Sequence, residues 1–578
     1  MAARKSRATV TVAEYLIQRL EEFGARHVFT VPGDYAGPFV SAMDHAEGIT
    51  RVGTTSELVA GYAADAYARL RGAGAACLTY GVGTFCVLNA LAGSYVEQLP
   101  VILIIGSPTR GNRRVERTEG VLYHHSTGTL TADADSVQNV VVARAVIRDG
   151  KTAPRKIDAA IEEAMRWRRP AYIEVLQNAW SQPCAAPSKP LRRRPLPIAR
   201  EALARALDET VKKLRGAKTP VIWAGLEVQR LGLQDELLDV LRATGLSYAT
   251  DLIGKGVLPE TTPGFVGVYD GASATKALRI LLETSDCVLG FGNLVTDDFL
   301  DLIQKNYGNM VLGWNNNVRV GKRTHRDVPL AAFMTGLLER LRDEGYHAPP
   351  RAEGRLMAMP SFAKRARLRF PKAAANLLAS PTQVTYERFF DRMKTWVDES
   401  MVLMADTSIV LYSAAELPVN ARDGFLAQAA WNSIGYTPGG ALGAGYGDPA
   451  RRPVVFVGDG GFQMTVQALS DIVRAKHGTI VFIFNNALYG IEQAFVNVKF
   501  FTQNEPPEAF DILHAWDYAR LVDVFRGGWS ATVTTMDELE AALETAKANT
   551  GTLSVIDLRI PEHDITPQML ALAQPGGG

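Results

Sequence analysis

The chain has few of the features that mark secreted, membrane-spanning or nucleic-acid-binding proteins. Its 578 residues include only four cysteines (Cys77, Cys86, Cys184 and Cys287) without paired spacing, so we expect neither a disulfide framework nor a zinc site. No apolar run reaches the about 18 residues of a membrane-spanning helix, and the basic start, Met1 to Arg7, lacks the apolar part of a signal peptide. Lys and Arg number 62 against 61 Asp and Glu, so no charge excess would attract nucleic acid or a membrane. We therefore expect a cytoplasmic protein with buried, reduced thiols.

The sequence does contain enough apolar residues for several hydrophobic cores. Hydrophobic residues make up 47% of the chain, and short apolar runs alternate with amphipathic stretches. This alternation is typical of α/β domains with parallel sheets. We predict an α/β fold of three consecutive doubly wound parallel-sheet domains. The expected domains span residues 1–185, 200–345 and 382–565, with linkers at 186–199 and 346–381 and a tail at 566–578.

Local patterns predict individual elements of these domains. Thr11 and Glu14 have the spacing of a capping box at the start of a helix. Apolar runs predict strands at His27–Val31, Ala75–Thr79, Val101–Ile105 and Ala171–Val175 in the first domain, and at Val221–Ala224, Cys287–Phe291 and Met310–Trp314 in the second. The Pro- and Arg-rich segment Pro183–Pro197 reads as a solvated connector without a binding role.

The most informative motif lies in the third domain. Gly458-Asp459-Gly460-Gly461 follows a predicted strand, and a second predicted strand ends on Asn485-Asn486. Because parallel strands end at the same edge of a sheet, Asp459 and Asn486 can meet there. Their oxygens, with a backbone carbonyl, suit Mg²⁺, and the glycines allow backbone N–H groups to approach a phosphate. The alternative is two tight turns without a ligand, and the combined spacing makes the magnesium–diphosphate site the better interpretation.

This spacing resembles the diphosphate motif of thiamine-diphosphate enzymes, and further motifs in the same order extend the resemblance over nearly the whole chain. They are similar to those of pyruvate and indolepyruvate decarboxylases. The motifs are Gly33-Asp34-Tyr35, Thr55-Ser56-Glu57, Tyr80-Gly81-Val82-Gly83, Tyr123-His124-His125 and Gly254-Lys255-Gly256. The resemblance implies pyrimidine-binding, central and diphosphate-binding domains, with thiamine diphosphate and Mg²⁺ as cofactors. It also implies a homodimer with shared active sites, which can assemble further into a tetramer.

The resemblance also implies which residues hold the cofactor. It makes Asp459, Asn486 and the backbone carbonyl of Leu488 the Mg²⁺ ligands, and Ile434 the apolar wedge that bends the cofactor. The other residues that it places at the cofactor are Glu57, Thr407, Asn432, Gly458, Gly460, Gly461 and Ile491. Ile409 and Leu411 are further apolar candidates for the pocket wall.

Five residues are implied as catalytic. The resemblance places Glu57 at the pyrimidine ring, where a carboxyl group promotes loss of a proton from the thiazolium ring. It assigns Asp34, His124, His125 and Glu492 to the relay of protons. Without the resemblance each has a simpler interpretation: Glu57 at a helix start, Asp34 in an Asx turn, two loop histidines, and Glu492 on a solvated helix face.

The implied reaction is the decarboxylation of a small 2-oxo acid to an aldehyde and CO₂. A carboligase that forms an acyloin is the main alternative, and a non-catalytic cofactor-binding relative is a further one. Two departures from the pyruvate decarboxylase pattern leave the substrate open among indolepyruvate, phenylpyruvate and branched 2-oxo acids: Ile409 stands where threonine is usual, and Ala487-Leu488-Tyr489-Gly490 where Asp-Gly-Tyr-Thr is usual. A third, Gly461 in place of the usual serine, removes a hydroxyl contact to the phosphate but keeps the backbone donor.

Overall fold

The computed structural model describes residues 9–349 and 382–573, which form two compact units. The first unit comprises the chain up to residue 195 together with two later segments, 438–449 and 465–475. The second unit comprises residues 196–437, 450–464 and the chain from 476 onwards. The linker expected at 346–381 and the end at 574–578 lie almost wholly outside the described residues. Within the described ranges, no helix combines the length and apolar character needed to cross a bilayer.

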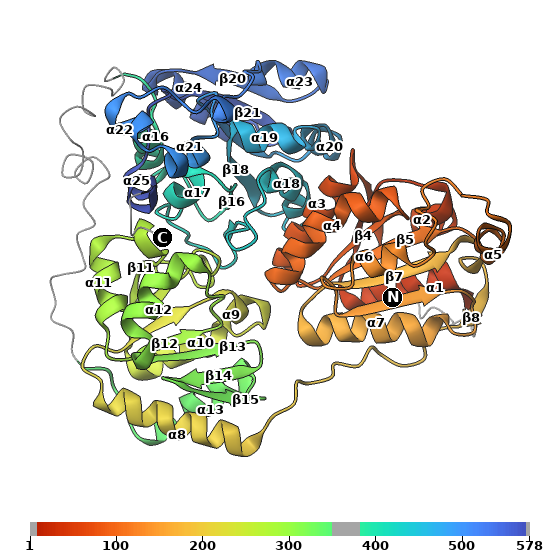
Figure 1. The fold of residues 1–578 in the computed structure, drawn as a ribbon. Helices are drawn as coiled ribbons and strands as arrows, with labels where there is room; N and C mark the ends of the chain where they lie inside the picture. Colours follow the sequence, from red (N-terminus) through yellow and green to blue (C-terminus); the bar gives the residue numbers. More distant parts are fainter. Residues whose placement is uncertain (1–8, 350–381, 574–578) are drawn as a thin grey trace. The chain divides into compact units, whose positions relative to one another are not determined.

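The first unit contains a parallel sheet of six strands in the order β3-β2-β4-β5-β7-β6 (Figure 1). Its strands are β2 (His27–Thr30), β3 (Thr50–Gly53), β4 (Gly74–Thr79), β5 (Val101–Ser107), β6 (Ala143–Ile147) and β7 (Ala171–Leu176). The four strands predicted here are confirmed within two residues at each end. Helix α1 (Val12–Phe23) begins at the predicted capping box, in which the Thr11 N–H donates to the Glu14 carboxylate at 2.7 Å.

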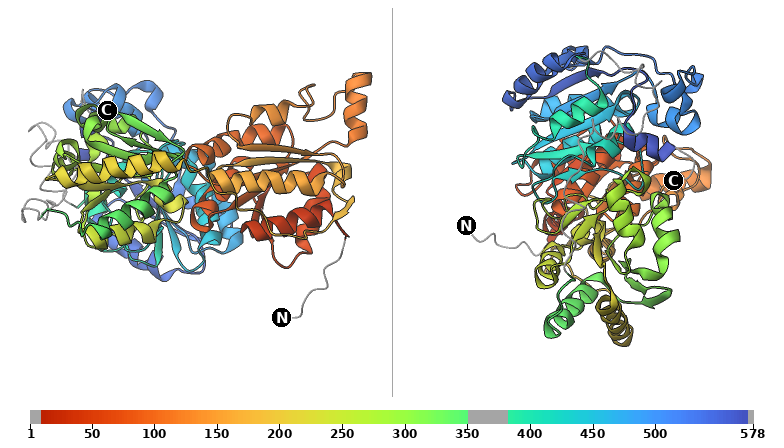
Figure 2. Two further views of the ribbon diagram at one scale, coloured as in Figure 1. Left: turned by 90° about the horizontal axis from the view of Figure 1, so that it is seen from below. Right: turned by 90° about the vertical axis from the view of Figure 1, so that its left-hand side faces the viewer.

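Helices cover both faces of this sheet (Figure 2). Alternate strand residues such as Val28 and Ile104 share a core with α1, α2 (Gly37–Asp44) and α7 (Ala153–Trp167). Residues of opposite parity, such as Phe29, are equally buried, on the side of α3 (Glu57–Arg71) and α4 (Val82–Val96). The unit also contains α5 (Arg110–Glu119), α6 (Ala132–Ser136) and a small antiparallel pair, β1 (Thr9–Thr11) with β8 (Pro183–Ala185).

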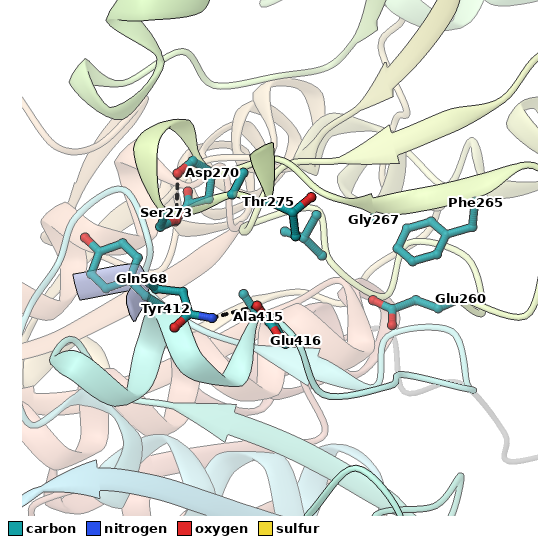
Figure 3. Close-up of a pocket in the computed structure, with 12 residues that line it drawn as sticks. Glu260, Phe265, Gly267, Asp270, Ser273, Thr275, Tyr412, Ala415, Glu416 and Gln568 are labelled. Atoms are coloured by element: carbon teal, nitrogen blue, oxygen red, sulfur yellow. Dashed lines mark hydrogen bonds between the residues drawn. The ribbon is translucent and has the colours of Figure 1, made fainter. Parts of the chain in front are cut away.

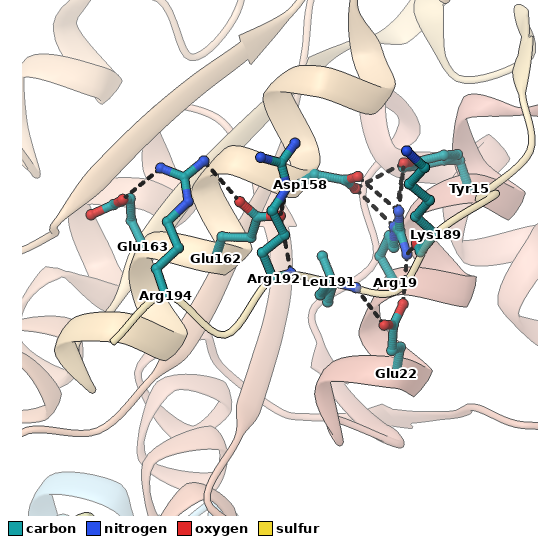
Figure 4. Close-up of polar contacts among 10 residues, drawn as sticks. All are labelled: Tyr15, Arg19, Glu22, Asp158, Glu162, Glu163, Lys189, Leu191, Arg192 and Arg194. Atoms are coloured by element: carbon teal, nitrogen blue, oxygen red, sulfur yellow. Dashed lines mark hydrogen bonds and ion pairs between the residues drawn. The ribbon is translucent and has the colours of Figure 1, made fainter. Parts of the chain in front are cut away.

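The segment at residues 189–194, predicted to be a solvated connector, is exposed except for Leu191 but has contacts with helices of the first unit (Figure 4). The Lys189 carbonyl accepts a hydrogen bond from Arg19 at 2.9 Å, and the Leu191 N–H donates to Glu22 at 2.6 Å. Arg194 forms an ion pair with Glu162 of α7 at 3.2 Å. Because backbone groups are used as well as side chains, this part of the expected linker has a defined path over α1 and α7.

The second unit contains two sheets, the first of which belongs to the central domain. Its seven strands have the order β11-β10-β9-β12-β13-β14-β15. They are β9 (Val221–Ala224), β10 (Tyr248–Thr250), β11 (Phe265–Val268), β12 (Val288–Phe291), β13 (Met310–Trp314), β14 (Asn317–Val320) and β15 (Arg323–Arg326). The first five are parallel, and the last two add an antiparallel edge that the apolar pattern did not indicate. Asn315 and Asn316 make this edge possible, because both have the positive φ that a two-residue hairpin turn requires.

Helices surround the central sheet and complete its core. They are α8 (Arg200–Gly216), α9 (Leu226–Arg230), α10 (Gln234–Thr244), α11 (Lys276–Thr284), α12 (Leu300–Asn306) and α13 (Leu330–Asp343). α8 and α10 both pack on α13, and their apolar residues join those of the strands in one cluster.

The last sheet is parallel, with the strand order β17-β16-β18-β19-β21-β20. Its strands are β16 (Met401–Ala405), β17 (Phe425–Leu426), β18 (Arg452–Gly458), β19 (Ile480–Asn485), β20 (Trp529–Val533) and β21 (Ser554–Arg559). Its helices are α16 (Tyr386–Met393), α17 (Ile409–Ala414), α19 (Asp459–Thr465), α21 (Gly490–Val496), α22 (Lys499–Gln503), α23 (Leu521–Val524), α24 (Met536–Ala548) and α25 (Pro567–Ala573). Helices α18 (Tyr436–Gly447) and α20 (Ala468–Ala475) fall almost wholly in the two later segments of the first unit. The assignment of residues 566–573 to a tail is wrong, because α25 is a helix whose Met569 is fully buried in this domain's core.

Candidate active site

A pocket in the second unit lies at the carboxyl ends of β16, β18 and β19, as the sequence predicts for Asp459 and Asn486. It is lined by Tyr386, Thr407, Ser408, Ile409, Ile434, Gly458, Asp459, Gly460, Gly461, Phe484, Asn486, Leu488, Tyr489, Gly490, Ile491 and Glu492. All the predicted cofactor residues of this domain except Asn432 are among them. Of the further apolar candidates, Ile409 lines the pocket, whereas Leu411 is buried in the hydrophobic core.

The predicted Mg²⁺ ligands come together at two adjacent strand ends. Asp459 follows β18 and is 1% exposed, and its carboxylate accepts hydrogen bonds from the N–H groups of Gly460 at 3.0 Å and Ala487 at 2.7 Å. The Asn486 side-chain oxygen accepts from the Leu488 N–H at 3.3 Å. Ala487 has φ +57°, a strained conformation for alanine, which turns its N–H towards Asp459. The two loops are therefore held together by direct contacts between them.

The residues present fit a magnesium–diphosphate group. Burial raises the pKa of Asp459 to about 7, and a divalent cation beside it would favour the ionised carboxylate. The Asn486 side-chain nitrogen is buried and lacks a hydrogen-bond partner among the described residues. A Cβ atom on Gly460 would lie 2.4 Å from the Tyr489 ring, so only glycine leaves its backbone this close to the loop. A buried carboxylate, an amide and close backbone N–H groups are the donors and acceptors that such a group needs.

The loop that carries Ile434 is anchored by Asp406, a residue that the sequence analysis did not identify. Asp406 is 1% exposed and follows β16. Its carboxylate accepts from the N–H groups of Gly435 and Thr437, each at 2.8 Å, and from the Thr437 hydroxyl at 2.8 Å. Burial raises the pKa of Asp406 to about 6. Its position directly before Thr407, after a strand, was the only sequence signal, because its partners lie about thirty residues further along the chain.

Asn432 lies in the same loop, at a positive φ of 54°, and accepts a hydrogen bond from the Thr407 hydroxyl at 3.4 Å. Asn432 is thus joined to Thr407, which lines the pocket, although Asn432 does not line it. Ile434, Gly460 and Gly461 line the same pocket. A Cβ atom on Gly461 would lie 3.3 Å from the Gly435 nitrogen, so this glycine is close to the loop that carries Ile434.

Glu492 and Ile491 lie in the first turn of α21 and line the same pocket. A segment missed by the sequence analysis, residues 508–513, packs beside them. Its Asp511 carbonyl accepts from the Tyr489 N–H at 2.9 Å, and its Leu513 N–H donates to the Ala487 carbonyl at 2.9 Å. Asp511 is 2% exposed, and burial together with Glu492 and Glu508 raises its pKa. The loop at 487–489 is therefore supported from both sides.

The remaining candidates lie in the first unit, at the carboxyl ends of its strands. Glu57 is the first residue of α3, and a Cβ atom on Gly83 would lie 3.7 Å from its Cγ atom. Asp34 begins a short 3₁₀ helix after β2. The Tyr80 hydroxyl donates to the His124 carbonyl, and the ring of His125 lies 6.0 Å from the Tyr80 ring. These contacts bring both histidines to the glycine-rich turn that also approaches Glu57.

The loop before Glu57 is anchored by α20, a helix from the carboxy-terminal part of the chain. Asp471 accepts hydrogen bonds from both the N–H and the hydroxyl of Thr55, each at 2.9 Å. Arg474 donates to the carbonyl of Gly53, and Gln467 to the Ser56 hydroxyl at 3.4 Å. These contacts fix the start of α3, and with it Glu57, and no pattern near Glu57 in the sequence indicated them.

Comparison with known proteins supports the resemblance over the whole chain. Models of the thiamine pyrophosphate enzyme family match in the order N-terminal TPP binding domain (residues 10–135), central domain (207–341) and C-terminal TPP binding domain (407–558). An alpha-keto-acid decarboxylase of Mycobacterium tuberculosis is 30% identical, over 97% of this chain and 96% of that protein. An indole-3-pyruvate decarboxylase of Azospirillum brasilense and a probable pyruvate decarboxylase of Schizosaccharomyces pombe are each 29% identical, over 97% of this chain and 98% and 95% of their own lengths. The chain therefore belongs to the family of thiamine-diphosphate-dependent 2-oxo acid decarboxylases.

Proposed function

We infer that this protein catalyses the non-oxidative decarboxylation of a 2-oxo acid to an aldehyde and CO₂, with thiamine diphosphate and Mg²⁺ as cofactors. The observation that carries this inference is the pocket in which Asp459, Asn486 and the loop at Leu488 come together at two strand ends. The names of the relatives favour release of an aldehyde over formation of an acyloin.

The chain's own residues would bind and orient the cofactor. Asp459, Asn486 and the Leu488 carbonyl would hold Mg²⁺, and the Gly460 and Gly461 N–H groups would donate to the diphosphate. Ile434 would support the bend between the two cofactor rings. Thiamine diphosphate, when bound, supplies an electron sink that makes the loss of CO₂ from a 2-oxo acid possible.

The acids and histidines would move protons. The Glu57 carboxyl would hold a proton against a ring nitrogen of the pyrimidine, and so promote proton loss at the reactive carbon. Glu492, which lines the pocket, would supply a proton at the carbon that has lost CO₂. Asp34, His124 and His125 would relay protons between this carbon, the departing aldehyde oxygen and solvent.

The finer properties are proposals that rest on the family and on the pocket lining. We propose a homodimer, able to form a tetramer, in which Glu57 of one copy serves the cofactor held by Asp459 of the other. Ile409, Ile434 and Ile491 line the pocket, and this apolar wall favours a 2-oxo acid with an apolar side chain. The four cysteines form no disulfide, which supports a cytoplasmic location.

A substrate panel tests the proposed function. The purified protein, reconstituted with Mg²⁺ and thiamine diphosphate, is supplied with pyruvate, phenylpyruvate, indolepyruvate and a branched 2-oxo acid. We expect aldehyde and CO₂ in equal amounts from at least one. Mass spectrometry of the products, with and without an added aldehyde, detects acyloins. Tight cofactor binding without turnover of any acid, or acyloin as the main product, would overturn the assignment.

A further inference from the structure

Tyr386 occupies a fixed position in the wall of the cofactor pocket. It is the first residue of α16, and its N–H donates to the Asp564 carboxylate at 2.7 Å. Its ring lies parallel to that of Phe484, with 5.2 Å between the ring centres and 1° between the planes. Phe484 stands two residues before the predicted metal ligand Asn486 and lines the same pocket. Both the backbone and the ring of Tyr386 are therefore held at the diphosphate end of the pocket.

The Tyr386 hydroxyl has no hydrogen-bond partner among the described residues, although the residue is only 3% exposed. Because Tyr386 lines the pocket, this unpartnered donor is available to a ligand bound there.

Besides Tyr386, the side-chain donors of the pocket wall are the Asn486 amide, which also lacks a partner among the described residues, and the hydroxyls of Thr407, Ser408 and Tyr489. Ile409 and Gly461 have no polar side-chain atom, and Asp459 can only accept hydrogen bonds when ionised. The Ser408 hydroxyl is already used within the chain, because it accepts from the Val410 N–H at 3.4 Å and donates to the Asp406 carbonyl at 3.5 Å. A phosphate oxygen placed near Asp459 would therefore find in Tyr386 a side-chain donor that has no competing partner.

We propose that Tyr386 is a further cofactor-binding residue, whose hydroxyl donates a hydrogen bond to the diphosphate group. This inference rests on the proposed function, because it needs a diphosphate in this pocket. The hydrogen bond is charge-assisted, a class about twice as strong as a neutral one. The ring position set by Phe484 and the helix start set by Asp564 orient the hydroxyl before the ligand arrives.

The test is the variant Tyr386→Phe, which removes only the hydroxyl and keeps the stack on Phe484. Tyr412→Phe is the matched control in the same domain, because Tyr412 lines a different cavity, together with Glu416 and Gln568 (Figure 3). Isothermal titration calorimetry measures the Kd of Mg²⁺ with inorganic pyrophosphate and of Mg²⁺ with thiamine diphosphate for both variants and the unmodified protein. Thermal melting checks that each variant is folded.

We expect Tyr386→Phe to raise both Kd values about ten- to hundredfold, and Tyr412→Phe to change them less than about twofold. Kd values for Tyr386→Phe within twofold of those of the unmodified protein, or an equal rise in Kd in both variants, would overturn the proposal. If Tyr386→Phe does not fold, Tyr386→Met takes its place, since methionine adapts to irregular space. Failure of both variants to fold would show a purely structural role and also overturn it. If the unmodified protein binds neither ligand, the proposed function itself is wrong.

Discussion

A single buried carboxylate, that of Asp459, is the central ligand of the proposed metal site. Asp459 is held by two backbone N–H groups and is almost fully enclosed, so its charge is costly unless a cation lies beside it. Asp459→Asn keeps the size and one oxygen but removes the charge. We expect this variant to fold and to lose Mg²⁺-dependent retention of thiamine diphosphate, with a Kd at least about a hundredfold higher. Gel filtration followed by mass spectrometry measures the retained cofactor, and a variant that still carries one cofactor per chain would contradict the metal assignment.

The proposed role of Glu57 concerns the rate of turnover and leaves the affinity for the cofactor unchanged. It opens α3, and Ser56 caps that helix by accepting from the Val59 N–H at 3.3 Å, so the helix start does not depend on Glu57 alone. Glu57→Gln should therefore keep the fold and the cofactor Kd but lower kcat by about 10²–10⁴-fold, because the amide cannot transfer the proton. Rates of aldehyde formation at saturating cofactor check this. A variant with nearly normal kcat would refute the catalytic role and leave only helix stabilisation.

At the scale of elements, α19 and the contacts that hold the Ile434 loop approach so closely at Gly461 that a side chain there would clash. A Cβ atom on Gly461 would lie 2.8 Å from the Asp406 carboxylate, which holds that loop through Gly435 and Thr437. We expect Gly461→Ala to lower the free energy of unfolding by about 1–3 kcal/mol and to weaken cofactor binding. Gly458→Ala is the matched control, since its Cβ would meet Ser408 at an ordinary 3.5 Å. Equal melting temperatures for the two variants would contradict this account of the contact.

Helix α16 carries a partly buried carboxyl group, and we expect it to make the stability depend on pH. Burial, with Asp391 and Asp564 nearby, raises the pKa of Glu387 to about 7, and one of its oxygens is buried without a partner among the described residues. A raised pKa in the folded state favours folding at low pH, and this contribution is lost as the pH rises through about 7. Glu387→Gln should therefore raise Tm at pH 8 and leave it nearly unchanged at pH 4. Melting curves at both values test this, and an equal effect at both would show that ionisation is not the cause.

At the scale of the whole molecule, the predicted site residues divide between the two units. Asp34, Glu57, His124 and His125 lie in the first, and the loops proposed to bind the metal and the cofactor lie in the second. If each site is shared between two copies, a heterodimer of Glu57→Gln and Asp459→Asn has one intact site. Co-expression of these two inactive variants should then restore about a quarter of the normal activity, because half of the dimers are mixed and each has one working site. No recovery, with mixed dimers confirmed by mass spectrometry, would show that each site is built from one chain.

The sequence by itself determined many of the strands and the spacing of the Asp459–Asn486 motif, because these depend on residues close together in the chain, but it missed the antiparallel edge β14–β15 and helix α25. The capping box at Thr11 and the strands either side of Asp459 and Asn486 follow from spacing and apolar runs. Only the tertiary structure decided what supports the site. Asp406 holds Gly435, Asp471 holds Thr55, and Tyr386 stacks on Phe484, each across a long stretch of chain. Burial and close approach create these contacts, and no local pattern encodes which distant partner a buried polar group will meet.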